Sequence, residues 1–273
     1  MKTANEVRKG IVTAVHSAKS GHPGGSLSAA DIYTYLYFEE MNIDPKDPKK
    51  ADRDRFVLSK GHTAPGYYST LAHRGFFPVE DLTTLRKVGS YLQGHPDMKH
   101  IPGVDMSSGS LGQGISAAVG MAISAKLSDD DYRVYTLLGD GEIQEGQVWE
   151  AASLAAQQKL SNLIAFVDWN KKQLDGYISD INDFSNIAER FAAFGWDAVT
   201  VDGHDVAAIA DAIENAKRLD DDRPHCIVLD TIKGKGCSFV SDADSNHHVT
   251  ISAEQLAAGL AELEEELAKA VAE

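Results

Sequence analysis

The segment Gly139-Asp140-Gly141, directly after the apolar run "YRVYTLL" (132–138), is the feature that most constrains the fold. The run is rich in aromatic and β-branched residues, so it predicts a buried strand over 132–140. A glycine on each side of the acid lets the backbone pass close to a bulky ligand. Because ligands bind at the carboxyl ends of strands in open α/β sheets, this segment predicts a ligand site at the strand tip.

Further segments of the same kind alternate with amphipathic ones. The additional strands are expected at 162–170, 196–203 and 225–233, and each is expected to be buried. The connecting helices are expected at 146–158, 186–195 and 205–219. This alternation predicts an α/β fold, with a mostly parallel sheet and helices on both faces.

The first 130 residues are predicted to be mostly helix and loop. A helix within 26–41 is expected to begin with a capping box formed by Ser28 and Asp31. The segment 112–127 is small and apolar nearly all round, which predicts a buried helix. A helix at about 252–273 is expected to pack on the chain itself, or alternatively to contact a partner. Without a repeat or linker, residues 1–273 are predicted to form a single domain.

Composition limits the classes of partner. The 273 residues carry a net charge of −15, which argues against nucleic acid or an anionic membrane. No apolar run is long enough to span a membrane, and the first residues lack a secretory signal, so a cytoplasmic protein is expected. Cys226 and Cys237 form no CxxC pattern, as expected for reduced thiols. An anionic substrate would need a local positive clamp, or one from another chain.

A second polar residue falls at an equivalent strand end. Asn170 closes the segment "NLIAFVDWN", thirty residues after Asp140. If the two strands are neighbours, a carboxylate and an amide oxygen converge. Such oxygens suit Mg²⁺ or Ca²⁺, with a backbone carbonyl and diphosphate oxygens completing the coordination.

This pair resembles the signature of thiamine-diphosphate-dependent enzymes. The resemblance implies that Asp140 and Asn170 are side-chain metal ligands, and that Lys172 offers its main-chain carbonyl. The family usually has an apolar residue where Lys172 stands, but only the carbonyl is used there.

Five further motifs resemble those of transketolases and occur in the same order along nearly the whole chain. They are "SGHPGGSLSAADI" (20–32), "SKGHTAPGYY" (59–68), "QGHPD" (93–97), "SGSLGQG" (108–114) and "KGKGCSF" (233–239). The match is to the amino-terminal, diphosphate-binding section of transketolase. The resemblance therefore implies a thiamine-diphosphate-binding fold, and the N-terminal subunit of a split transketolase.

The resemblance also implies a set of catalytic histidines, which surround the reactive carbon of the cofactor and the sugar hydroxyls. They are His22, His62, His95 and His247. Neutral imidazole both donates and accepts hydrogen bonds and can move protons near neutral pH. "SNHHV" departs from the family's usual His-Gly, so His248 is an alternative to His247.

The cofactor contacts implied by the resemblance lie in several of these segments. They are His62, Gly109, Ser110, Leu111, Gly139, Asp140, Gly141, Glu145, Asn170 and His247. Ser110 stands where proline is common. Glu145 would couple the two cofactor sites of a dimer, whereas Glu142 has no matching role and is expected to face solvent. Lys235 could reach the mouth of the site.

The implied reaction moves a two-carbon unit from a ketose phosphate to an aldose. In transketolases a second domain supplies the glutamate that activates the pyrimidine ring and the arginines that bind the sugar phosphate. This chain is therefore expected to be inactive alone and to need a separately encoded C-terminal subunit carrying the pyrimidine-binding domain, with two copies of each chain. The ketose used is left open.

Two other classes of function remain. One is another thiamine-diphosphate enzyme, such as the α subunit of a 2-oxo acid dehydrogenase or a deoxyxylulose-phosphate synthase fragment. Enzymes acting on 2-oxo acids need not keep hydroxyl-binding histidines, so His22, His62 and His95 favour transketolase. The other is a non-catalytic cofactor-binding or scaffold protein.

Overall fold

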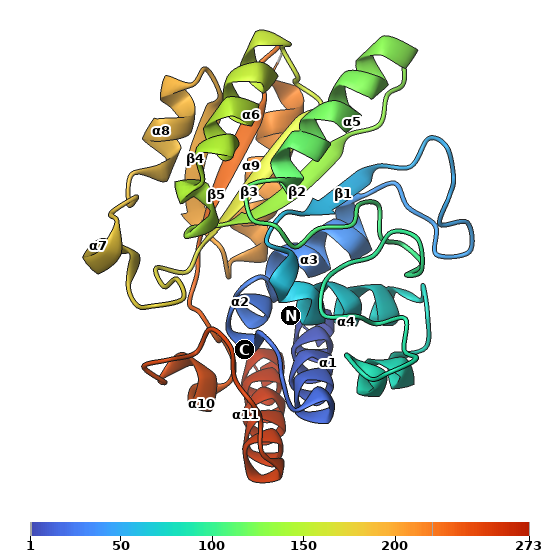
Figure 1. The fold of residues 1–273 in the computed structure, drawn as a ribbon, viewed down its shortest axis with the longest axis vertical. Helices are drawn as coiled ribbons and strands as arrows, with labels where there is room; N and C mark the ends of the chain where they lie inside the picture. Colours follow the sequence, from blue (N-terminus) through green and yellow to red (C-terminus); the bar gives the residue numbers. More distant parts are fainter. Residues whose placement is uncertain (1, 220, 273) are drawn as a thin grey trace.

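A five-stranded, all-parallel sheet with helices on both faces forms the centre of the molecule (Figure 1). The computed structural model describes residues 2–219 and 221–272. The strands lie in the order β1-β2-β3-β5-β4. Their bounds are Arg55–Leu58 (β1), Val134–Gly139 (β2), Leu163–Trp169 (β3), Asp197–Asp202 (β4) and His225–Asp230 (β5). The predicted fold class is confirmed.

The strand predictions were right in four places and incomplete in one. The segments expected as strands contain β2 to β5, each slightly shorter than predicted. The four-residue strand β1 was missed because it has no room to show an alternating pattern. The expected burial is wrong for β4, which lies at the sheet edge with partly and fully exposed residues.

Two apolar layers hold the helices against the sheet. One layer joins side chains of β1, β2, β3 and β5 to the helices α3, α4 and α9. The other joins the opposite face of the same strands to α5, α6 and α8. The bounds are Ala30–Tyr35 (α3), Ala64–Arg74 (α4), Gly114–Ser128 (α5), Gly146–Gln157 (α6), Ile187–Ala193 (α8) and Val206–Arg218 (α9). Burial on both faces explains why these strands are continuous apolar runs.

A smaller helical layer stands beside the sheet. It consists of α1 (Lys2–Ala18), α2 (Pro23–Ser28) and α11 (Ala253–Ala272), with Val7, Ile11, Leu27 and Leu263 in its core. The helix α11 lies along α1, where the Asn5 amide donates to the Leu263 carbonyl at 2.6 Å. This contact agrees with the expectation that the terminal helix packs on its own chain.

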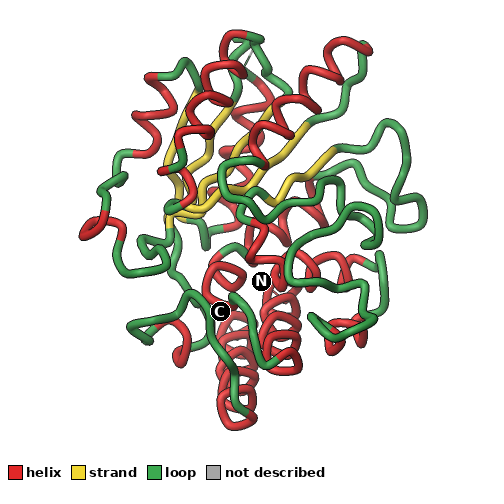
Figure 2. Tube along the Cα trace, viewed as in Figure 1, coloured by secondary structure: helices red, strands yellow, loops and turns green. Residues whose placement is uncertain are grey.

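The connections carry most of the candidate site residues. A long loop with one short 3-10 helix (Val79–Thr84) joins α4 to α5 (Figure 2). Two short helices, α7 (Ile178–Ile181) and α10 (Ser238–Ser241), lie in the connections after β3 and β5. Within residues 2–219 and 221–272, no helix is both long and apolar enough to cross a membrane.

Two helix predictions need correction. Ser28 and Asp31 form no capping box: Ala29 is the N-cap of α3, without a side-chain cap. Ser28 instead donates to Asp168, and Asp31 pairs with Arg8, because both are drawn into buried polar networks. The helix α5 is buried on one side only, since Leu127 in its last turn is exposed. Small apolar residues around a helix therefore did not mean burial on all sides.

Candidate functional site

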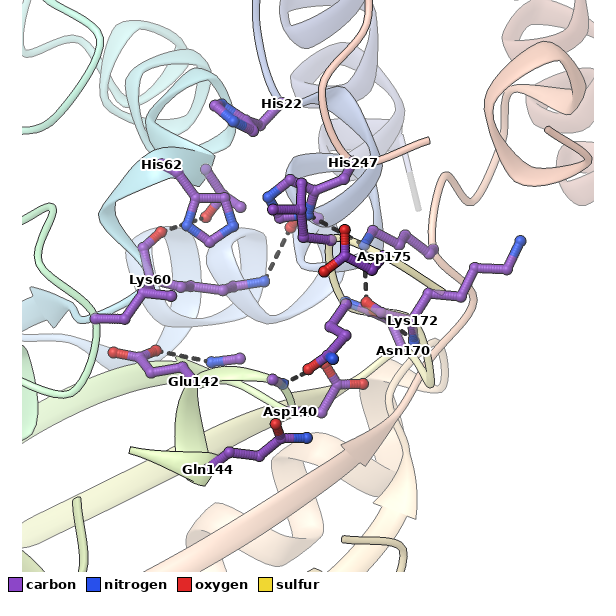
Figure 3. Close-up of a pocket in the computed structure, with 18 of the residues that line it drawn as sticks. His22, Lys60, His62, Asp140, Glu142, Gln144, Asn170, Lys172, Asp175 and His247 are labelled. Atoms are coloured by element: carbon purple, nitrogen blue, oxygen red, sulfur yellow. Dashed lines mark hydrogen bonds between the residues drawn. The ribbon is translucent and has the colours of Figure 1, made fainter. Parts of the chain in front are cut away.

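Asp140 and Asn170 lie at strand tips, as predicted, and the two strands are neighbours, the condition on which their convergence depended (Figure 3). Asp140 is 3% exposed and accepts hydrogen bonds from the backbone nitrogens of Gly141, at 2.8 Å, and Lys171, at 2.6 Å. Burial, and then the nearby charge of Asp168, raise the pKa of Asp140. A binding partner that favours the ionised form, such as a cation, would therefore stabilise this carboxylate.

A buried ion pair beneath the strand tips orients Asn170. Asp168 is fully buried and accepts from the Lys60 ammonium at 2.5 Å. The Asn170 amide nitrogen donates to the same Asp168 oxygen at 2.9 Å, which turns the Asn170 amide oxygen away from Asp168. Burial alone would raise the pKa of Asp168, but the Lys60 charge and hydroxyl donors hold it below its usual value. Sequence reasoning missed this pair because neither residue has a partner nearby in the chain.

Lys233, at the start of the segment 233–239, is another residue of the site that the sequence did not predict. Its ammonium donates to the main-chain carbonyl of Lys172 at 2.8 Å, the carbonyl expected to face a metal. Burial lowers the pKa of Lys233, while the charges of Asp140 and Asp168 oppose that shift. Lys235, which was expected to reach the mouth of the site, instead lies 3.6 Å from Glu266 of α11. That expectation is wrong, because the intervening turn directs the two lysines to different partners.

Three of the predicted histidines form a cluster at the edge of the cavity. The ring centroids of His22, His62 and His247 lie 5.0 to 5.2 Å from one another. Burial is the main cause that lowers their pKa, to about 3 for His22, about 2 for His62 and about 4 for His247. All three are therefore neutral at neutral pH, the state in which imidazole both donates and accepts.

His247 and His248 lie in different surroundings. His247 lines the cavity, and its Nδ1 lies 3.4 Å from the Lys233 ammonium. His248 is exposed, and its Nε2 lies 3.0 Å from the hydroxyl of Ser20. His247 is thus the one that faces the interior of the site.

The loop before α5, residues 108–113, reaches the cavity through one residue, Leu111. Gly109 and Gly112 have positive φ angles of 151° and 79°, which favour glycine. His95 packs against Gly109: a Cβ there would lie 3.0 Å from the His95 ring. Leu111 lines the cavity, whereas Ser110 is exposed and does not.

Glu142 was expected to face solvent, and this is wrong. Its side chain is 2% exposed and accepts from the backbone nitrogens of Gly112 and Gly139, each at 2.9 Å. The hydroxyl of Ser59 is a third donor, at 2.5 Å. Glu142 therefore joins the loop before α5 to the tip of β2. Glu145 is exposed at the cavity rim.

The cavity has a volume of about 530 Å³, within the range of small-molecule sites. Most of the predicted site residues line it, namely His22, His62, Leu111, Gly139, Asp140, Gly141, Glu145, Asn170, Lys172 and His247. His95, Gly109 and Ser110 lie outside its lining. In Figure 3, Asp140 and Asn170 lie on one side of this cavity, and His22, His62 and His247 lie on another.

Parallel strands with an acid and an amide at adjacent tips, at the edge of a cavity, place the chain among ligand-binding α/β domains. The family model described as "Transketolase, thiamine diphosphate binding domain" matches residues 1–267. The chain belongs to the transketolase family, as its thiamine-diphosphate-binding section.

Similar proteins include single subunits and much longer chains. The 6-deoxy-6-sulfo-D-fructose transketolase subunit SqwG of Clostridium sp. strain MSTE9 is 46% identical, over 96% of this chain and 95% of its own length. An apulose-4-phosphate transketolase subunit of Phocaeicola vulgatus is 40% identical, over 96% of this chain and 92% of its own. The solved transketolase of Leishmania mexicana has a TM-score of 0.90 and 33% identity, covering 96% of this chain and 41% of that one.

Proposed function

We propose that this chain is the N-terminal subunit of a split transketolase, which transfers a two-carbon ketol unit from a ketose phosphate to an aldose. The observation that carries the proposal is the cluster of His22, His62 and His247 on the cavity that also contains Asp140 and Asn170. Imidazoles at this spacing suit hydroxyl and carbonyl oxygens of a sugar. Related chains named as transketolase subunits, nearly equal in length, support the same function.

The residues of the cavity fit thiamine diphosphate with a divalent cation. A carboxylate and an amide oxygen are hard donors suited to Mg²⁺ or Ca²⁺. The bond to Asp168 turns the Asn170 oxygen away from that carboxylate, and this oxygen accepts from the Lys172 backbone nitrogen at 3.3 Å with a second lone pair left for a cation. Among the residues that the structure describes, no three His, Cys, Asp or Glu side chains gather as a metal cluster. Diphosphate oxygens and the Lys172 carbonyl are proposed to complete the coordination.

Lys233 lies beside the proposed cation position. Its ammonium donates to the Lys172 carbonyl at 2.8 Å, and the second lone pair of that oxygen is left for a cation. The glycines at 139 and 141 leave room for a ligand to approach the tip of β2. The loop before α5 is proposed to contact the cofactor through Gly109, Ser110 and Leu111. Glu145, at the rim of the cavity, is proposed to contact the cofactor or to couple it to the second cofactor site of a dimer.

The chain's own residues would then manage protons and orientation. Thiamine diphosphate, when bound, supplies the electron sink that lets a two-carbon unit move between sugars. His62 and His247 are neutral and can donate to or accept from sugar oxygens as their charge changes. His22 stands beside both, and its Nδ1 is buried without a protein partner among the residues that the structure describes. His95, which packs against Gly109, is proposed to contact the substrate as well.

A second subunit is proposed to complete each site. This chain covers 41% of the solved transketolase of Leishmania mexicana, and its relatives of similar length are named as subunits. The partner would carry the pyrimidine-binding domain and the arginines that bind a sugar phosphate, with two copies of each chain. The buried, unpaired thiols of Cys226 and Cys237 agree with a cytoplasmic location, which forms part of the proposal.

A transfer assay with thiamine diphosphate and Mg²⁺ tests the proposal, on this chain alone and with its partner subunit. Activity is expected only in the mixture, and Asp140→Ala should abolish it. Asp131→Ala, which removes an exposed loop acid, is the matched control and should keep full activity. Full activity from this chain alone would refute the need for a partner. Activity with pyruvate in place of ketose phosphates would favour a 2-oxo acid enzyme, and failure of the mixture to bind thiamine diphosphate would favour a non-catalytic protein.

A further inference from the structure

A second polar cluster lies at the rim, next to the catalytic histidines, and consists of Ser20, Arg86 and His248. The Arg86 guanidinium donates to the Ser20 hydroxyl oxygen at 2.9 Å. The same oxygen lies 3.0 Å from His248 Nε2, and the His248 ring centroid lies 5.0 Å from that of His22. The imidazole of His248 therefore lies next to that of His22, which lines the cavity.

The backbone holds His248 in this place. An antiparallel bridge joins Gly21 to Val249, in which the Val249 nitrogen donates to the Gly21 carbonyl at 3.0 Å. The next residue, Thr250, donates its hydroxyl to the Lys19 carbonyl at 3.0 Å. His248 is thus followed directly by two anchored residues, although its ring is exposed.

Two tautomers of His248 satisfy its bond to Ser20, because a hydroxyl oxygen has two acceptor lone pairs and one proton. The guanidinium of Arg86 only donates, so Ser20 accepts from it in both cases. In one tautomer the Ser20 proton donates to His248 Nε2, and the imidazole proton lies on Nδ1. Among the residues that the structure describes, no group pairs with His248 Nδ1, so this tautomer presents a free donor at the rim.

The charge of Arg86 also acts on this part of the site. Within the described chain, no carboxylate forms an ion pair with Arg86, despite the net charge of −15. After burial, the charge of Arg86 is the next cause that lowers the pKa of His95. The charge of Arg86 also helps to lower the pKa of His22. There burial is the largest cause, and the charges of His247 and His248 come next. The rim beside the histidines is therefore electropositive and rich in donors.

We propose that His248 is a specificity-determining residue, which donates from Nδ1 to a hydroxyl of the sugar substrate beyond the reacting carbons. Ser20 and Arg86 are positioning residues that hold His248 in the donating orientation. The inference rests on the proposed function, because the sugar chain must leave the cavity past His22 to meet His248.

The test compares a long acceptor, ribose 5-phosphate, with a short one, glycolaldehyde, in the two-chain enzyme. Loss of one hydrogen bond should lower kcat/KM for ribose 5-phosphate relative to glycolaldehyde by roughly three- to tenfold in His248→Ala. His248→Asn, whose amide offers both a donor and an acceptor, should recover part of this ratio. Arg86→Met should shift the ratio in the same direction and add little to His248→Ala, because the two act as one unit. His100→Ala, at an exposed histidine elsewhere, is the control and should not change the ratio.

A spectroscopic measurement on the full chain tests the orientation separately. Long-range proton–nitrogen correlation spectra should show the His248 proton on Nδ1, and Arg86→Met should disturb that preference. A proton on Nε2, or an unchanged acceptor ratio in an active His248→Ala enzyme, would overturn the inference. Absence of transfer by the wild-type pair with both acceptors would refute the proposed function, and the inference with it.

Discussion

The buried pair of Lys60 and Asp168 gives the sharpest test of how this site is held together. The two side chains are 2% and 0% exposed, and their charged atoms are 2.5 Å apart. Asp168→Asn keeps the size of the side chain but leaves the Lys60 charge without its partner. Removing one partner of a buried pair typically costs about 3–5 kcal/mol. Since the hydroxyls of Ser28 and Thr231 also donate to Asp168, a loss in this range of the free energy of unfolding is expected.

The measurement is urea denaturation followed by circular dichroism, with linear extrapolation to water. The matched control is Asp222→Asn, in the exposed pair of Lys159 and Asp222, whose side chains are 66% and 64% exposed. Exposed pairs contribute about 0–1 kcal/mol, and asparagine tolerates the positive φ of 58° at this position. Equal losses of less than about 1 kcal/mol in both variants would refute the reasoning, because they would mean that burial adds nothing to the pair.

Three further predictions concern the stability of the chain. Gly61→Ala should lower the free energy of unfolding by about 1–3 kcal/mol, because the new Cβ would lie 2.7 Å from the backbone nitrogen of Gly109. Gly120→Ala, in mid-helix with open space around it, should raise the free energy of unfolding by about 0.5–1 kcal/mol. Urea denaturation measures both, and a stabilised Gly61→Ala would contradict the packing. By the same method, Glu142→Gln should lower the free energy of unfolding by about 1–3 kcal/mol. The amide has one oxygen in place of two, so it cannot accept the hydrogen bonds of all three buried donors. Wild-type stability in this variant would contradict the reasoning. Because the folded pKa values of His22 and His62 lie below the unfolded value of 6.5, their contribution to stability is present above pH 6.5 and is lost as the pH falls. Each of these two histidines should lower the free energy of unfolding by about 1.4 kcal/mol for every pH unit below pH 6.5. Urea denaturation at several pH values measures this slope, which should be smaller in His62→Asn. An unchanged slope in that variant would contradict the lowered pKa of His62.

The sequence alone determined the fold class and the centre of the site. Apolar runs alternating with amphipathic segments predict a parallel sheet, because only strands buried on both faces are apolar throughout. The sequence placed Asp140 and Asn170 at strand ends, and their convergence followed on the condition that β2 and β3 are neighbours, which the structure meets. The histidines at 22, 62 and 247 were found through motifs, and the structure brings them together on one cavity.

Only the tertiary structure decided the partners of the charged residues. Glu142 and Lys233 look like surface residues in the sequence, yet both are buried, because donors and acceptors from distant segments offset the cost of burying their charge. Asp168 orients Asn170, and Lys60, more than one hundred residues away in the chain, helps to keep Asp168 ionised. Local patterns report which side chains are apolar and where strands end, but the burial of a charge depends on groups that only folding brings within hydrogen-bonding distance.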